Sequence, residues 1–300
     1  MILSYTVKNN STIINVKQIL KNEFLLSDRL IRKLKLNNKI YINSIPVSVN
    51  FKVNTNDVIS VNIDFEEDNS NIVPTKMDLD IIYEDTAYLI INKPAGVPTH
   101  PSCLHYTNSL SNGIKYYFDS IDLKKKIRPV NRLDKNTSGI VVFAKNEYIQ
   151  ECLIRQMQNN IFKKEYIAIL SGILEKSVGT IDAPIARKDD SIIERYISIN
   201  GDKAITEYKV IQTIKNNSLV LFKLRTGRTH QIRVHSQYLG HPILGDTLYG
   251  TSSSIINRQA LHSYKINFIH PISKEKVTYI APLPNDMSKI ILPYFNNSAM

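Results

Sequence analysis

The segment NRLDKNTSGIVVFA, residues 131–144, joins a polar turn to an apolar run and decides how the rest of the chain is interpreted. Asn, Asp, Thr, Ser and Gly are typical of a turn before a strand, and the apolar run has the length of a buried strand. Asp134 lies in this turn between Arg132 and Lys135. Cationic neighbours favour the charged form of a carboxylate, and an ionised carboxylate can attack a sugar carbon. Asp134 is therefore either a turn-former, as most such residues are, or a catalytic carboxylate.

Outside this segment, short apolar runs alternate with turn residues from residue 79 onward. Helical spacing appears between only some of these runs, for example over residues 148–157. The pattern predicts an α+β domain over residues 79–300 with a large, mostly antiparallel sheet. The predicted strands are IIYED (81–85), YLIINK (88–93), GIVVFAKN (139–146), EYIAIL (165–170), TEYKVI (206–211), LVLFKL (219–224) and KINFIH (265–270).

Residues 1–65 predict a small separate module. Apolar residues fall at helical spacing over residues 16–24, and Ser27 is a good N-cap for a second helix. Two short strand-like runs follow, at residues 40–42 and 58–63. This order of elements indicates a small α/β domain.

The segment 66–78 is polar, partly acidic and without periodicity. Such a composition is typical of a linker. We therefore expect a small domain over residues 1–65, a linker over 66–78 and the large domain after it.

The composition indicates a nucleic-acid partner. The chain has 300 residues, a formal net charge of +11 and a pI of about 9.4, and a strongly basic protein favours a polyanion. No apolar stretch is long enough to span a bilayer, and two cysteines give neither a disulfide framework nor a clustered metal site. We expect a cytoplasmic protein, not bound to a membrane.

Two groups of basic residues are candidate contacts to RNA phosphates. One group follows the outer face of the second predicted helix, and the other lies a few residues upstream of Asp134. Each group could equally be a solvated surface. The residues are Arg29, Arg32, Lys33, Lys124, Lys125, Lys126 and Arg128.

Three further segments accompany the Asp134 turn, and together they closely resemble the RluA/RluD family of pseudouridine synthases. The catalytic motif of that family usually reads H-R-L-D-x-x-T-S-G, and residues 131–139 match it except that Asn131 replaces the His. The other matches are NKPAG at 92–96, KEY at 164–166 and GRTHQIR at 227–233. The resemblance implies an enzyme that isomerises uridine in RNA to pseudouridine.

The resemblance also implies roles for individual residues. Asp134 is the catalytic carboxylate, Tyr166 stacks on the target base, and Arg233 pairs with Asp134. Arg132 fills the space that the flipped base leaves, and we expect Arg228 to contact RNA nearby. Asn131 is expected to make the same kind of hydrogen bond to backbone as the usual His.

The small N-terminal module resembles the S4-type RNA-binding domain. The resemblance rests on SDRLIRKLKLNNKIYIN at 27–43 and VNTNDVISV at 53–61. Family members with such a domain usually act on large-subunit ribosomal RNA, which makes 23S-type RNA the expected partner and tRNA the alternative. The reaction requires no nucleotide, metal or flavin cofactor, and we expect a monomer.

Two other classes of protein remain as alternatives. One is a catalytically idle RNA-binding or ribosome-assembly protein, which would explain the charge but not the joint presence of Asp134, Tyr166 and Arg233. The other is a glycosidase-like hydrolase that uses paired carboxylates such as Asp80 and Glu84. A metal site built from His230, His235 and His241 is disfavoured because the spacing lacks the order of known metal motifs.

Overall fold

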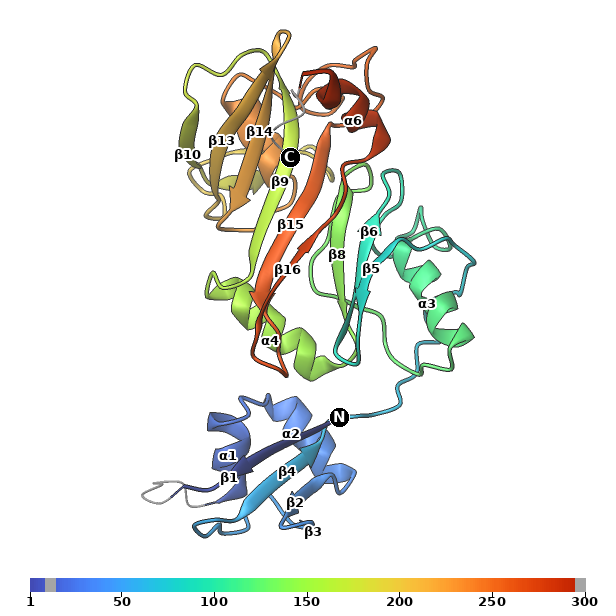
Figure 1. The fold of residues 1–300 in the computed structure, drawn as a ribbon, viewed down its shortest axis with the longest axis vertical. Coiled ribbons are helices and arrows are strands. Elements are labelled where there is room, and N and C mark those ends of the chain that lie inside the picture. Colours follow the sequence, from blue (N-terminus) through green and yellow to red (C-terminus); the bar gives the residue numbers. More distant parts are fainter. Residues whose placement is uncertain (9–14, 295–300) are drawn as a thin grey trace.

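A computed structural model describes residues 1–8 and 15–294 of the chain. Its strands form a small sheet near the N-terminus and a large sheet over the rest of the chain. Figure 1 shows the two sheets one below the other, with a single extended segment between them. The first 62 residues contain every strand of the small sheet, and the large sheet begins at Ile81.

The small sheet is four-stranded, in the order β1-β4-β2-β3, and two helices pack against it. Each helix begins with a side-chain cap: Asn15 accepts a hydrogen bond from the backbone N–H of Gln18, and Ser27 accepts one from that of Leu30. Ser27 is therefore the N-cap that the sequence predicts. The elements are β1 (Ile2–Thr6), α1 (Val16–Asn22), α2 (Asp28–Leu36), β2 (Ile40–Ile42), β3 (Ile45–Pro46) and β4 (Val58–Asn62).

The large sheet is ten-stranded and confirms the predicted α+β class with mostly antiparallel strands. The order along its main path is β10-β13-β14-β9-β15-β8-β6-β5, with β16 paired to β15 and β7 paired to β8. Each of the seven predicted runs lies in one of these strands. The bounds are β5 (Ile81–Glu84), β6 (Tyr88–Lys93), β7 (Arg128–Pro129), β8 (Ser138–Ala144), β9 (Lys163–Ser171), β10 (Val178–Asp182), β13 (Ile205–Ile214), β14 (Asn217–Leu224), β15 (Leu261–Ile269) and β16 (Lys276–Ile280).

A short parallel pairing between β8 and β15 joins the two halves of the large sheet. Ser138 pairs with His262, and Gly139 pairs with Ser263. Gly139 has φ +108°, and a Cβ at this position would lie 2.3 Å from the carbonyl oxygen of Ser263. Because no side chain fits there, glycine is required for the two strands to meet directly after the Asp134 turn.

The remaining elements surround the large sheet. All seven residues of β8 are buried, which explains their continuous apolar character. In Figure 1, α3 lies beside β5 and β6, α4 lies at the end of the sheet nearest the small module, and α6 lies at the opposite end. These elements are α3 (Leu110–Ser120), α4 (Glu147–Gln158), β11 (Ile185–Arg187), β12 (Arg195–Ile197), α5 (Gln231–Tyr238), α6 (Asn285–Ile291) and a 3₁₀ turn, Leu292–Tyr294.

Gly227 and Thr229 predict a turn and an N-cap before a short helix over residues 230–239. The structure instead places His230 at the N-cap of α5, in the left-handed region with φ 57° and ψ 18°, so the predicted helix start is wrong by one residue. The His230 side chain makes no capping hydrogen bond. Instead, the Gln231 side chain accepts hydrogen bonds from the backbone N–H of Arg228 and from the Thr226 hydroxyl. These bonds hold the loop that leads into α5.

Candidate active site

Asp134 lies in the turn between β7 and β8, and hydrogen bonds from buried residues hold that turn in place. The backbone N–H of Thr137 donates to the carbonyl of Asp134 over 3.1 Å, which closes the turn. Thr99 adds a second link, because its hydroxyl donates to the carbonyl of Leu133 and accepts from the backbone N–H of the same residue. The Asp134 side chain itself stays 26% exposed.

A buried lysine ties the turn to the neighbouring strand end. The Lys93 side chain is fully buried, and its ammonium donates to the carbonyls of Pro94, Val97 and Lys135 over 2.7–3.0 Å. Burial lowers the pKa of Lys93 to about 7, and the charge of Asp134 opposes this shift. Three carbonyl acceptors require three N–H donors, which the ammonium form alone supplies. Lys93 therefore holds the Asp134 turn against the residue 94–97 turn.

Arg233 extends from α5 and connects two carboxylates. Its Nε and Nη2 donate to Asp246 over 2.7 and 2.8 Å, and its Nη1 reaches Oδ2 of Asp134 over 3.2 Å. Burial would lower the pKa of Arg233, but the two aspartates outweigh it and raise the pKa. Asp246 is fully covered. The bidentate pair with Asp246 therefore aims the remaining nitrogen of the guanidinium at Asp134.

His230 and Tyr249 complete the surroundings of Asp134. Nε2 of His230 lies 3.8 Å from Oδ1 of Asp134, and Nδ1 of His230 is 2.8 Å from the Tyr249 hydroxyl. The Arg233 guanidinium lies over the Tyr249 ring at 4.9 Å from its centroid. Aromatic and cationic groups thus enclose the carboxylate on the α5 side.

A hollow of about 70 Å³ opens beside Asp134 and brings together five residues predicted as site residues. The lining residues come from the Asp134 turn, β9, the end of β14, α5 and the start of β15. This is the place where an extruded base and its sugar could meet the carboxylate. The predicted residues in the lining are Arg132, Asp134, Tyr166, Arg228 and Arg233.

Tyr166 lies in β9 at the wall of this hollow and is 6% exposed. Burial raises the pKa of its phenol to about 12, a hydrogen bond from Ser263 acts in the opposite direction, and the charge of Asp134 adds to the rise. The phenol is therefore protonated at neutral pH. Its position fits contact with a base in the hollow.

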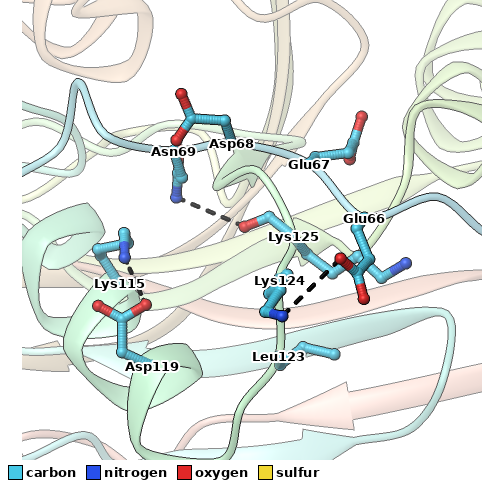
Figure 2. Close-up of a pocket in the computed structure, with 9 residues that line it drawn as sticks. All are labelled: Glu66, Glu67, Asp68, Asn69, Lys115, Asp119, Leu123, Lys124 and Lys125. Carbon is cyan, nitrogen blue, oxygen red and sulfur yellow. Dashed lines mark hydrogen bonds and ion pairs between the residues drawn. The ribbon is translucent and has the colours of Figure 1, made fainter.

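The basic cluster upstream of Asp134 lies elsewhere, against the acidic linker. Figure 2 shows Lys124 facing Glu66 across a separate pocket, at 3.8 Å. Lys125 forms an ion pair with Asp64 and donates to the carbonyl of Phe65. Lys126 is exposed. The carboxylates of Asp64 and Glu66 thus partly neutralise this cluster.

Arg128 and Lys33 meet at one linker carboxylate. Arg128 makes a bidentate pair with Glu67 over 2.6 and 2.7 Å, and its side chain is 12% exposed. Lys33, from α2, reaches Glu67 over 3.1 Å and Glu147 over 3.3 Å. These two cations join the small module, the linker and the large domain. Arg29 and Arg32 on the same helix are exposed, and Arg29 lies 3.9 Å from Glu147.

The carboxylates of the glycosidase alternative are both engaged away from the hollow. Asp80 accepts from the Asn92 side chain over 2.8 Å, and Glu84 pairs with Lys145 over 2.8 Å and accepts from the Tyr117 hydroxyl. Neither residue lines the hollow beside Asp134.

The three histidines of the metal alternative do not converge. His235 bonds to Thr206 and Ala183, and His241 bonds to the carbonyl of Ser171. Within residues 1–8 and 15–294, no group of three or more His, Cys, Asp or Glu side chains could hold a metal ion. No helix in the same part of the chain is long and apolar enough to cross a membrane.

Sequence reasoning missed three residues of this site as functional groups: His230, Asp246 and Tyr249. His230 lies inside the basic GRTHQIR segment at 227–233, and the other two residues lie shortly after it. The one available signal is the acidic residue that follows this basic segment, Asp246, because a buried arginine requires a carboxylate partner.

A carboxylate in a turn at the centre of a mixed sheet, faced by an arginine from the opposite half, fits an RNA-modifying isomerase of the pseudouridine synthase class. Residues 87–238 match the family model described as RNA pseudouridylate synthase. The chain belongs to this family and, within it, to the RluA/RluD group, as the sequence resemblance implies.

Curated relatives and solved structures give the same assignment. An uncharacterized RNA pseudouridine synthase of Bacillus subtilis, YjbO, is 40% identical over 90% of this chain and 95% of its own. Ribosomal large subunit pseudouridine synthase D of Neisseria meningitidis serogroup B is 35% identical over 84% of this chain and 71% of its own. The human RNA pseudouridylate synthase domain containing 1 superposes with a TM-score of 0.56 at 28% identity, over 68% of this chain and 83% of that chain.

Proposed function

We propose that this pseudouridine synthase acts on large-subunit ribosomal RNA in the cytoplasm, with Asp134 as its catalytic carboxylate. The observation that carries the proposal is the ion pair between Asp134, which is open to the hollow, and Arg233, which Asp246 holds from behind. The fixed guanidinium of Arg233 limits the carboxylate to one orientation.

The reaction breaks the bond between N1 of the uracil and C1′ of the ribose, and a bond between C5 and C1′ replaces it. The proton on C5 leaves and N1 gains a proton, so nothing is oxidised or reduced. Asp134 would either attack C1′ as a nucleophile or remove a proton from C2′. Both routes begin from the same ionised carboxylate, and the geometry is compatible with each.

Tyr166 would contact the flipped base. Stacking on an aromatic ring contributes roughly 1–3 kcal/mol per base, and Tyr166 lies in the wall of the hollow. Its raised pKa, about 12, keeps the hydroxyl protonated at neutral pH, which supports stacking more directly than proton abstraction from C5.

The RNA would approach over the exposed cations. Arg132 and Arg228 are exposed at the hollow, where Arg132 would fill the space that the flipped base leaves. We propose that residues 1–65 form an S4-like RNA-binding domain that presents Arg29 and Arg32, since both lie exposed on α2. Of the cluster upstream of Asp134, Lys126 is the residue best placed to reach phosphates, because Lys125 and Arg128 already bind carboxylates.

Large-subunit ribosomal RNA is favoured because several relatives carry the printed name of ribosomal large subunit pseudouridine synthase D. One of them, from Zymomonas mobilis, is 37% identical over 79% of this chain. Transfer RNA is the second candidate substrate. An idle RNA-binding protein is a weaker alternative, since Asp134, Tyr166 and Arg233 meet in one hollow.

The test is to map pseudouridine in unmodified large-subunit RNA transcripts and bulk tRNA after incubation with wild type or Asp134→Ala. We expect new pseudouridine in large-subunit RNA with the wild type and none with Asp134→Ala, at equal RNA affinity. Glu175→Ala, which removes an exposed carboxylate between β9 and β10, is the matched control and should behave as wild type. New pseudouridine in tRNA alone would show that the substrate is tRNA. New pseudouridine with Asp134→Ala would show that Asp134 is not the catalytic carboxylate.

A further inference from the structure

We infer that His230 is a positioning residue for Asp134, and that Tyr249 fixes the tautomer in which it does so. The neutral ring would donate its Nε2–H to Oδ1 of Asp134 while Arg233 holds Oδ2. This inference rests on the proposed role of Asp134. It assigns a function to the tyrosine and to the histidine, which the family resemblance leaves without one.

The backbone at His230 is the first observation. His230 has φ 57° and ψ 18°, in the left-handed region that favours glycine. A non-glycine residue held there is strained, and such strain is often found at functional sites. The conformation directs the ring into the hollow beside Asp134, where Nε2 lies 3.8 Å from Oδ1.

The hydrogen bonds of Tyr249 favour one tautomer of the His230 ring. The backbone N–H of Arg195 donates to the Tyr249 hydroxyl over 2.9 Å, so this oxygen already acts as an acceptor. Nδ1 of His230, at 2.8 Å, is the partner for the proton of the hydroxyl itself. Nδ1 therefore accepts, and a neutral ring with Nδ1 as acceptor carries its hydrogen on Nε2.

The surroundings keep the ring neutral. Burial lowers the pKa of His230, and the nearby cations Arg233 and Arg195 act in the same direction against Asp134 and Asp246. The ring is therefore uncharged at neutral pH and presents one N–H, on the side of Asp134.

The two oxygens of Asp134 thus face two different donors. Arg233 reaches Oδ2 over 3.2 Å, within hydrogen-bond distance, whereas His230 is 3.8 Å from Oδ1. The second distance is longer than a hydrogen bond. Catalytic hydrogen bonds are often long without substrate and shorten in the complex. The effect of His230 should therefore appear in the rate of the reacting complex and not in RNA affinity.

The test compares His230→Gln with His230→Met. The two side chains have similar length, and both residues are strained by the left-handed backbone at position 230. Only Gln keeps an N–H donor near the position of Nε2 of His230. The assay is release of tritium from RNA labelled at C5 of uridine, measured as a single-turnover rate at saturating enzyme, with RNA affinity and thermal stability measured beside it. We expect His230→Met to lower the rate about 10–100-fold at unchanged affinity, and His230→Gln to recover most of that loss.

Tyr249→Phe supplies a second measurement. Without the hydroxyl, the ring can place its hydrogen on either nitrogen, so we expect a smaller loss of rate, about 3–10-fold, at unchanged affinity. Equal rates for His230→Gln and His230→Met would overturn the inference, as would a loss of RNA affinity in place of rate. Asp134→Ala in the same assay separates the two proposals: if it is inactive while both His230 variants react like wild type, only the role of His230 fails.

Discussion

Two ionic clusters in this protein share one arrangement, a cation between two carboxylates, but have different surroundings. In the Asp134 cluster, Arg233 lies between Asp246 at 2.7 Å and Asp134 at 3.2 Å. In the linker cluster, Lys33 lies between Glu67 at 3.1 Å and Glu147 at 3.3 Å, and Arg128 adds a second cation at Glu67. Each cluster holds a cation between two carboxylates, and each joins segments that are distant in the sequence.

The two clusters differ in the exposure of their carboxylates. The side chains of Glu67 and Glu147 are only 8% and 14% exposed, and cations occupy the space around them. Asp246 is covered as well, but Asp134 is 26% exposed and faces a hollow. A cluster whose carboxylates are both covered can stabilise the fold but cannot reach a substrate. A cluster with one exposed carboxylate can also contact a substrate.

Among changes to the two clusters, a change at Asp246, the covered carboxylate of the Asp134 cluster, should lower the reaction rate most. Asp246→Asn removes one of the two acceptors that aim Arg233, so the guanidinium gains freedom beside Asp134. We expect the single-turnover rate of pseudouridine formation to fall about 100-fold, equivalent to about 2.7 kcal/mol in the barrier.

A second bidentate pair in the same chain serves as the control for Asp246→Asn. Glu67 holds Arg128 over 2.6 and 2.7 Å, both side chains are largely covered, and neither lines the hollow. Glu67→Gln weakens this similar pair and should leave the single-turnover rate of the folded protein unchanged. Equal rate losses in both variants would mean that Asp246 acts through general stability.

Breaking the linker cluster should affect stability and leave the chemistry unchanged. Glu67→Gln weakens the hydrogen bonds to Arg128 and Lys33, and charge-assisted bonds of this kind contribute roughly 1.5–3 kcal/mol. We expect the free energy of unfolding to fall by about 2 kcal/mol, with the same rate per folded molecule. Glu66→Gln, at an exposed neighbour of Lys124, should cost less than about 0.5 kcal/mol.

The pH dependence of stability sharpens the same comparison. Burial would raise the pKa of Glu67, but Arg128 and Lys33 outweigh it and hold the pKa below the ordinary value of 4.5. The charged form therefore stabilises the fold above that value, and the contribution is lost as pH falls through the lowered pKa. In denaturant titrations the wild type should lose more stability than Glu67→Gln when the pH is lowered below about 4.5.

The smallest effect is expected at Asn131. Its side chain is buried, donates to the carbonyl of Ile140 over 3.0 Å and accepts from the backbone N–H of Val142 over 2.9 Å. These bonds attach the start of the Asp134 turn to β8. Asn131→His should change turnover by less than tenfold, about 1.4 kcal/mol, and a larger loss would show that the residue touches the reacting groups.

The sequence predicts the strands of the large sheet well because they are short apolar runs between turn residues, and burial in a sheet requires that pattern. It does not predict β10, β11 and β12, which are only three to five residues long and mostly exposed or half-buried. The helix α3 was missed for a related reason: its buried residues include Ser111, Asn112 and Gly113, which carry no apolar signal.

The sequence could not separate the two ionic clusters. Arg128 and Arg132 are both basic residues shortly before Asp134, but one is covered by Glu67 and the other is exposed at the hollow. That distinction depends on a linker carboxylate about sixty residues away, Glu67, paired by tertiary contact. Motif resemblance identified Asp134, Tyr166 and Arg233, whereas the covered partner Asp246 required the structure.

The contact between β8 and β15 has a consequence for how the protein is made. Ser138 and His262 meet although 124 residues separate them. Closing so long a loop is slow, and contacts of this range delay folding. Until β15 has left the ribosome, the two half-sheets have unpaired edges and the strand beside the Asp134 turn lacks its neighbour. We therefore expect RNA modification to begin only after β15 has been made, although Asp134 and Arg233 are already present in the growing chain.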